Sequence, residues 1–115
     1  MSVMEKAKTL AEEIASSSEY SDLKNAQKTM NSDDEAKSIL DNYKSLQKRI
    51  QMVKANGKNV SAKQQKQLQA IKAKMKNNNK IKNFMEHQKR FNQLMQTVNQ
   101  TISGHLQNIN NTDKE

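Results

Sequence analysis

Residues 80–109, KIKNFMEHQKRFNQLMQTVNQTISGHLQNI, decide the fold class of this chain. Apolar side chains recur there every three or four positions, which is the period of one face of an α-helix. Such a helix would be about 45 Å long at roughly 1.5 Å per residue, longer than any core that a 115-residue monomer could wrap around it. We therefore expect its apolar stripe to face a second chain. The residues expected at that interface, with one polar interruption, are Ile81, Phe84, Met85, Gln88, Phe91, Met95, Val98 and Ile102.

Four shorter helices are expected ahead of this segment. Apolar residues at helical spacing occur over residues 3–14, 20–30, 36–53 and 68–75, and over 36–53 the steps alternate between three and four, as in a coiled-coil seam. The chain has no Pro, only two Gly and 3% aromatic residues, which favours helices over strands. The predicted fold is an all-α antiparallel helical bundle with long coiled-coil-like helices, completed by oligomerisation.

Capping signals mark where these helices begin. Ser16-Ser17-Ser18-Glu19 fits a capping box, with Ser18 as an equally good N-cap. Ser32 is expected to cap the third helix, with Glu35 reaching back to it. Ser61 and Gln64 form another box, Gly57 supplies the left-handed end of the preceding helix, and Asn77-Asn78-Asn79 is both a break and a cap.

Composition leaves intrinsic disorder as an alternative to this fold. Leu, Ile, Val and Phe make up about 17% of the chain, below the roughly 20% that usually accompanies a folded domain. The net charge is +8, which also favours disorder. Four capping signals nevertheless coincide with four changes of apolar stripe, and a disordered chain has no reason to show that coincidence. Folded helices are therefore the better interpretation.

No group of residues predicts catalysis or metal binding. His87 and His105 lie eighteen residues apart on one predicted helix, about 27 Å along its axis, and so cannot share a metal ion. The acidic cluster at residues 33–35 is explained by its place at a helix start. There is no Cys and no Gly-rich phosphate loop. We expect no catalytic residue, no metal, no cofactor and no small-molecule substrate.

The chain also lacks signals for secretion or membrane insertion. Its first residues, MSVMEKAKTLAEEI, do not combine a cationic region with an apolar run, as a signal peptide does. No apolar stretch approaches the length of a membrane span. The expected localisation is cytoplasmic.

Charge is segregated along the sequence. Residues 1–43 carry five Lys and nine acids, whereas residues 44–90 carry fourteen Lys or Arg and one acid, Glu86. The basic block within this stretch, residues 54–90, is interpreted as a solvated face or as a surface for an anionic partner, either an acidic protein or RNA phosphates. It has no aromatic residue before Phe84, which is expected in the apolar stripe, whereas single-strand binding usually adds stacking aromatics. The expected anionic-partner patch comprises Lys63, Lys66, Lys72, Lys76, Lys80 and Lys82.

Short motifs spread over nearly the whole chain resemble the YlbF/YmcA family of small helical bacterial regulators, which includes YheA-type proteins. The matching stretches are residues 7–14, Ser18-Glu19-Tyr20, Ala26, residues 33–40, Leu46-Gln47, Gly57-x-x-Val60-Ser61, Phe84-x-x-x-Gln88, Asn92-x-Leu94 and Val98-x-x-x-Ile102. The resemblance implies an all-α fold, self-association or association with related helical paralogues, and an accessory role in bacterial gene regulation.

In the best-known members of that family, a protein complex influences competence, sporulation and biofilm development. It works with the membrane-anchored endoribonuclease RNase Y on messenger-RNA processing. Some relatives carry a Cys-rich tail linked to an iron–sulfur cluster, whereas this chain has no Cys and cannot supply thiolate ligands.

The sequence therefore predicts one helical domain over residues 1–109 and a polar, flexible tail over 110–115. The leading functional hypothesis is a non-enzymatic adaptor. It would bind itself, paralogues or a protein such as an RNA-processing enzyme. The alternative is a direct RNA- or DNA-binding protein, largely indifferent to sequence, that uses the basic block at residues 54–90.

Overall fold

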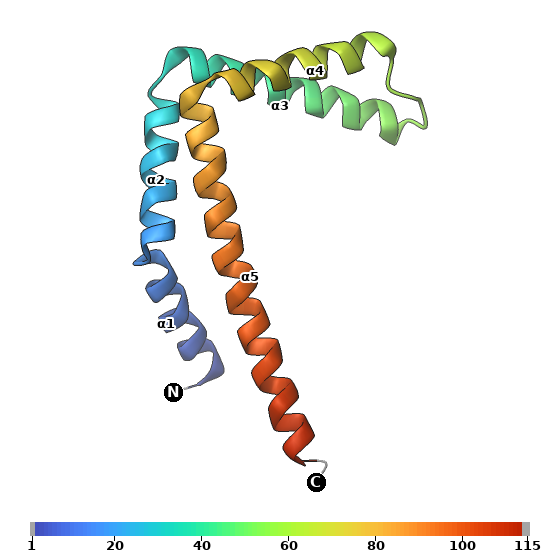
Figure 1. Ribbon diagram of the computed structural model, residues 1–115. Helices are drawn as coiled ribbons and strands as arrows, with labels where there is room; N and C mark the ends of the chain where they lie inside the picture. The colour runs from blue at the N-terminus through green and yellow to red at the C-terminus, as the bar shows by residue number, and fades with distance from the viewer. Residues whose placement is uncertain (1, 114–115) are drawn as a thin grey trace. The chain divides into compact units, whose positions relative to one another are not determined.

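The computed structural model describes residues 2–113 and contains five helices and no strand within them (Figure 1). The helices are α1 (Val3–Ala15), α2 (Ser18–Asn31), α3 (Asp34–Ala55), α4 (Ala62–Asn77) and α5 (Asn79–Asp113). The all-α prediction is confirmed, while completion of a bundle by oligomerisation stays a prediction. The last helix runs four residues beyond the expected end at Ile109, into the predicted tail. Lys114 and Glu115 lie outside the described residues.

The chain divides into two compact units. We call Asn25–Met85 the hairpin unit, and Met1–Lys24 with Glu86–Glu115 the terminal unit. Both α2 and α5 contribute residues to each unit. The prediction of a single domain over residues 1–109 stays a prediction.

The hairpin unit is organised around α3 and α4, which lie side by side and run in opposite directions (Figure 1). Its core is built from Met30, Ala36, Met75 and Ile81, and the last of these is fully buried. Partly buried side chains surround that core: Ile39, Leu40, Tyr43, Ile71 and Phe84. Removing these apolar groups from water stabilises the hairpin unit.

The terminal unit has a thinner apolar contact. The rings of Tyr20 and Phe91 lie 5.7 Å apart between centroids, at an interplanar angle of 56°, a favourable tilted arrangement. Leu23 is buried, and no residue of α1 is. Aromatic packing between α2 and α5 is therefore the clearest anchor within this unit.

Two helix starts differ by one residue from the sequence prediction. The Ser17 hydroxyl accepts a hydrogen bond from the Tyr20 amide at 3.2 Å, so Ser17 caps α2 rather than Ser16 or Ser18. Asp33, and not Ser32, caps α3. Ser32 instead donates its hydroxyl to a carbonyl of α2, and Glu35 makes no hydrogen bond back to the cap among the described residues. Where several adjacent residues can each act as an N-cap, the packing of the helix determines which one does.

The remaining expected signals are confirmed. Ser61 and Gln64 form the reciprocal capping box at the start of α4. Gly57 has φ +74°, and the amides of Lys58 and Gly57 donate to the carbonyls of Val53 and Lys54, which defines a Schellman ending of α3. Similarly, the Asn78 side chain accepts from the amides at positions 80 and 81 and caps α5.

Candidate interaction surfaces

The predicted interface stripe begins inside the core of the hairpin unit. Ile81 has no exposed surface and Phe84 packs against the same core. Their apolar surface is therefore largely covered by the chain itself. Met85, one position further along, is 51% exposed. The interface role of these three residues stays a prediction.

The middle of the stripe is partly covered within the terminal unit. Phe91 contacts Tyr20, while Met95 and Val98 are half-buried. Gln88 is also half-buried and donates its side-chain amide to Asn92 at 3.4 Å. This polar interruption is satisfied within α5 itself.

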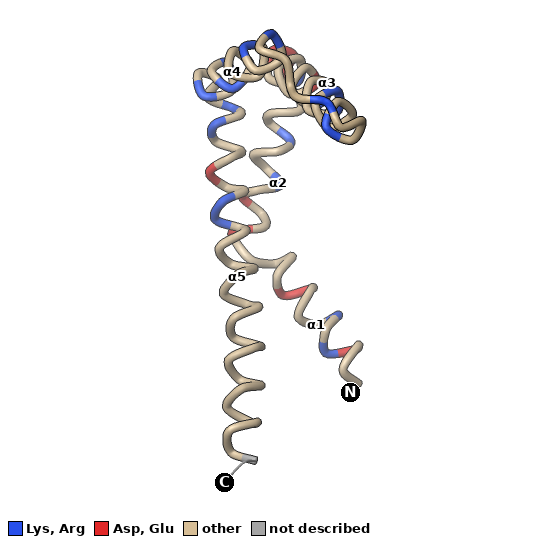
Figure 2. The backbone as a smooth tube through the Cα atoms, turned by 90° about the vertical axis from the view of Figure 1, so that its right-hand side faces the viewer, with Lys and Arg blue, Asp and Glu red and all other residues tan. Residues whose placement is uncertain are grey.

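The end of the stripe is uncovered. Every residue from 101 to 112 is exposed, and the apolar side chains Ile102, Leu106 and Ile109 share one side of the helix because they are four and three positions apart. We call these three residues the C-terminal face. Residues 91–112 also contain no Asp, Glu, Lys or Arg, as the uniformly tan end of α5 shows in Figure 2.

Most Lys and Arg positions fall within the hairpin unit, as the blue segments of the backbone show in Figure 2. This unit carries fourteen Lys or Arg against four acids, whereas the terminal unit has six against eight. All six residues of the predicted anionic-partner patch are exposed. They surround α4 and the first turn of α5 rather than sharing one side, since Lys66 and Lys72 project from different sides of α4. The patch is therefore a field of charge and not a single site.

One lysine of the patch already pairs with an acidic side chain of the same molecule. The Lys80 ammonium lies 3.1 Å from Oδ1 of Asp33, whose Oδ2 accepts a hydrogen bond from the Ala36 amide at 3.0 Å. That amide and, second, the Lys80 side chain hold the pKa of Asp33 below its ordinary value. Lys80 thus helps to hold the start of α3 and is less free than its neighbours to meet an external anion.

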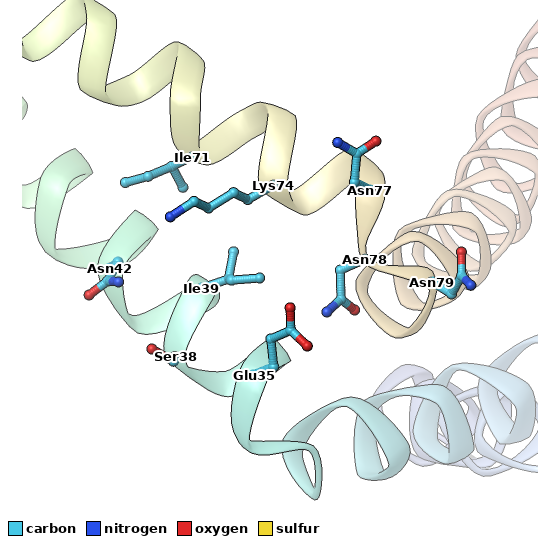
Figure 3. Close-up of a pocket in the computed structure, with 9 residues that line it drawn as sticks. All are labelled: Glu35, Ser38, Ile39, Asn42, Ile71, Lys74, Asn77, Asn78 and Asn79. Carbon is cyan, nitrogen blue, oxygen red and sulfur yellow. The ribbon is translucent and has the colours of Figure 1, made fainter.

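A groove runs between α3 and α4 on one side of the hairpin. One hollow of about 570 Å³ lies at the end nearer Asn78, and a second of about 340 Å³ lies further along. Both are lined by Asn42 and Ile71, so the two hollows adjoin. Figure 3 shows Asn78 turned into the first hollow, Lys74 extended over it from α4, and Glu35 at its end. The second hollow is bordered by Arg49.

Sequence reasoning missed this groove. No motif marks Asn42 or Arg49, because the sequence does not say which sides of α3 and α4 leave a gap between them. One sequence signal does mark its surroundings: residues 42–85 contain twelve Lys or Arg and no acid. That run extends beyond the predicted anionic-partner patch and also includes cations of α3.

Within residues 2–113, no three His, Cys, Asp or Glu side chains gather as a metal site would require. None of the described helices combines the length and the apolar character needed to cross a membrane.

These features define a small all-α protein with two exposed surfaces, one apolar and uncharged on α5 and one cationic on the hairpin. The chain belongs to the YlbF/YmcA family: residues 3–107 match the family described as Control of competence regulator ComK, YlbF/YmcA. The resemblance noted in the sequence is therefore confirmed.

Several curated bacterial proteins are similar along most of their length. A UPF0342 protein of Bacillus licheniformis is 30% identical over 100 residues, which cover 87% of this chain and 86% of the relative. A UPF0342 protein of Desulfitobacterium hafniense is 28% identical over 106 residues, covering 92% and 81%. The UPF0342 protein YheA of Bacillus subtilis is 27% identical over 96 residues, covering 84% and 82%.

Two solved structures share the fold. A chain in the crystal structure of Bacillus subtilis RicA in complex with RicF matches with a TM-score of 0.76 at 20% identity, over 91% of this chain and 93% of that one. A protein of unknown function (DUF964) from Bacillus stearothermophilus matches with a TM-score of 0.78 at 21% identity, over 91% and 92%. At such identities the likeness concerns the fold alone.

Proposed function

We propose that this protein is a non-enzymatic helical adaptor that binds a second copy of itself or a related helical protein through the C-terminal face of α5. The observation that carries this proposal is the exposure of that face. Ile102, Leu106 and Ile109 are 47%, 62% and 49% exposed, on a helix segment with no exposed charge beside them. A contiguous apolar stripe of this kind is typical of a protein-interaction site.

Charge supports a helical partner of the same kind. The hairpin unit of one copy repels that of another, because each carries ten more positive than negative residues. Residues 91–112 carry no formal charge, so two such helices meet without that repulsion. Apolar residues spaced by three and four positions are also the pattern with which helices pack against one another.

The regulatory part of the proposal rests on family membership. The family is described by control of the competence regulator ComK, and a structural relative was crystallised as a complex, RicA with RicF. We infer an accessory role in bacterial gene regulation, exercised with an RNase Y-type RNA-processing enzyme in competence, sporulation or biofilm development. The adaptor would bring that enzyme and its helical partners into one assembly.

The association is tested with two charge-matched double variants. Ile102→Asp with Leu106→Asp places two carboxylates on the C-terminal face, whereas Gln100→Asp with Gln107→Asp places two on the other side of the same helix. Light scattering after size-exclusion chromatography should show both the unmodified protein and the Gln100/Gln107 variant as oligomers. The dissociation constant of the Ile102/Leu106 variant should be at least about 100-fold higher, because a charge buried without a partner is strongly unfavourable. A monomeric unmodified protein at high micromolar concentration would contradict the proposal.

The adaptor role needs a partner assay free of bridging RNA. Purified protein, treated with nuclease, should capture a purified RNase Y-type endoribonuclease, and the Ile102/Leu106 variant should capture less than the Gln100/Gln107 variant. Equal capture by both variants would show that the endoribonuclease does not bind through the C-terminal face.

A further inference from the structure

Residues 42–85 of the hairpin unit carry charge of a single sign. Over residues 42–85 all twelve Lys and Arg side chains are exposed and no acid is interspersed. Within the hairpin unit the one ion pair joins Lys80 to Asp33, which lies outside this stretch. Eleven cations of residues 42–85 therefore have no acidic partner there.

A merely solvated surface does not account for this distribution. Ordinary solvated surfaces intersperse both signs, since a large field of one sign repels itself and destabilises the compact state. The chain does have acids, but those of the hairpin unit lie at the start of α3, between Asp33 and Asp41. A polyanion bound to the surface of residues 42–85 would neutralise these cations and relieve the repulsion between them.

The groove between α3 and α4 supplies a place for such a ligand. Arg49 and Lys74 border its two hollows, one on each helix. Between them lie an apolar floor formed by Ile39 and Ile71 and the amide of Asn42, while the Glu35 carboxylate lies at the end of the first hollow (Figure 3). The Oδ1 atom of Asn78 caps α5, while its Nδ2 donates no hydrogen bond within the described residues.

We propose that this groove binds single-stranded nucleic acid, with Arg49 and Lys74 on backbone phosphates and unpaired bases over the apolar floor. Amide side chains and an apolar surface suit the edges and faces of unpaired bases, which a duplex hides. Phosphate contacts release counterions, so binding is strongly dependent on salt. None of the described residues that line the groove is aromatic, so binding lacks strong stacking and is weak and tolerant of sequence.

Nucleic acid fits this surface better than an acidic peptide. Cations lie on the groove and also on the far side of each helix, as Lys76 does on α4 and Lys44 on α3. A peptide helix or strand would meet only one of these sides. A flexible chain with a charge on every nucleotide can follow the groove and continue around the hairpin.

The experiment is a fluorescence-anisotropy titration of a labelled single-stranded RNA of about 20 nucleotides, between roughly 50 and 200 mM salt. With about four phosphates contacted, the affinity should fall roughly 50-fold across that range. Arg49→Gln with Lys74→Gln removes two contacts, and the slope of log affinity against log salt should become shallower by about 1.4.

Lys6→Gln with Lys8→Gln is the matched control, because it removes the same charge from exposed positions of α1. This variant should leave the slope unchanged, and circular dichroism should show equal helicity for all three proteins. Equal losses in both variants, or no binding at low salt, would overturn the proposal. So would a polyglutamate peptide that displaces the RNA at equal charge concentration. The adaptor function does not depend on the outcome, since it uses α5.

Discussion

Asp33 joins two segments that lie 47 positions apart in the chain. One carboxylate oxygen caps α3 at the Ala36 amide and the other receives the Lys80 ammonium. Both interactions favour the ionised form, which is why the pKa of Asp33 is lowered in the folded protein. The stabilisation is therefore complete at neutral pH and is lost as the pH falls below about 4, through the lowered folded-state pKa.

Substitutions at Asp33 separate these two contributions. Asp33→Asn keeps a capping oxygen and loses the charge, while Asp33→Ala loses both, so the melting temperature at neutral pH should fall in the order Asp, Asn, Ala. Asp34→Asn is the control, since Asp34 makes no hydrogen bond from its side chain among the described residues. The gap between the unmodified protein and Asp33→Asn should narrow as the pH falls below about 4, as thermal unfolding followed by circular dichroism will show. Equal effects of Asp33→Asn and Asp34→Asn would refute this role.

At the scale of the helices, the two glycines have opposite effects. Gly57 ends α3 with φ +74°, a conformation that costs a residue with a Cβ about 1 kcal/mol. Gly104 lies inside α5, where an added Cβ would meet nothing within 4 Å, and Gly in a helix costs roughly 0.5–1 kcal/mol relative to Ala. Gly57→Ala should therefore destabilise the protein and Gly104→Ala should stabilise it, in urea unfolding at one protein concentration. A shift of the same sign in both variants would contradict this assignment.

The helices could largely be predicted from the sequence, and their docking could not. Apolar spacing and the signals at Gly57, Ser61 and Asn78 located the elements to within a few residues, because these are local interactions. The caps at Ser17 and Asp33 were missed by one position, since neighbouring side chains have the same chemistry. The groove beside Asn42 depends on how two helices pack, and no local pattern encodes that.

For the molecule as a whole, the partition of charge has a consequence for stability. Repulsion among twelve cations in residues 42–85 opposes folding, while the one ion pair within residues 2–113, Lys80 with Asp33, favours it. Salt screens both, and the repulsion involves many more pairs. The melting temperature should therefore rise between about 20 and 200 mM sodium chloride. A falling melting temperature in the same thermal scans would show that attractive pairs dominate.

The uncharged stretch of α5 also determines how the protein can be cut. Trypsin cleaves only after Lys and Arg, and none occurs between Arg90 and Lys114. Complete digestion therefore releases residues 91–114 as one peptide, while the cationic hairpin falls into short fragments. Hydroxyl-radical oxidation of the intact protein, followed by digestion and mass spectrometry, reports on Met95, Leu106 and their neighbours in that single peptide. Its total oxidation should decrease as protein concentration rises, so one mass signal records how much of the C-terminal face is covered.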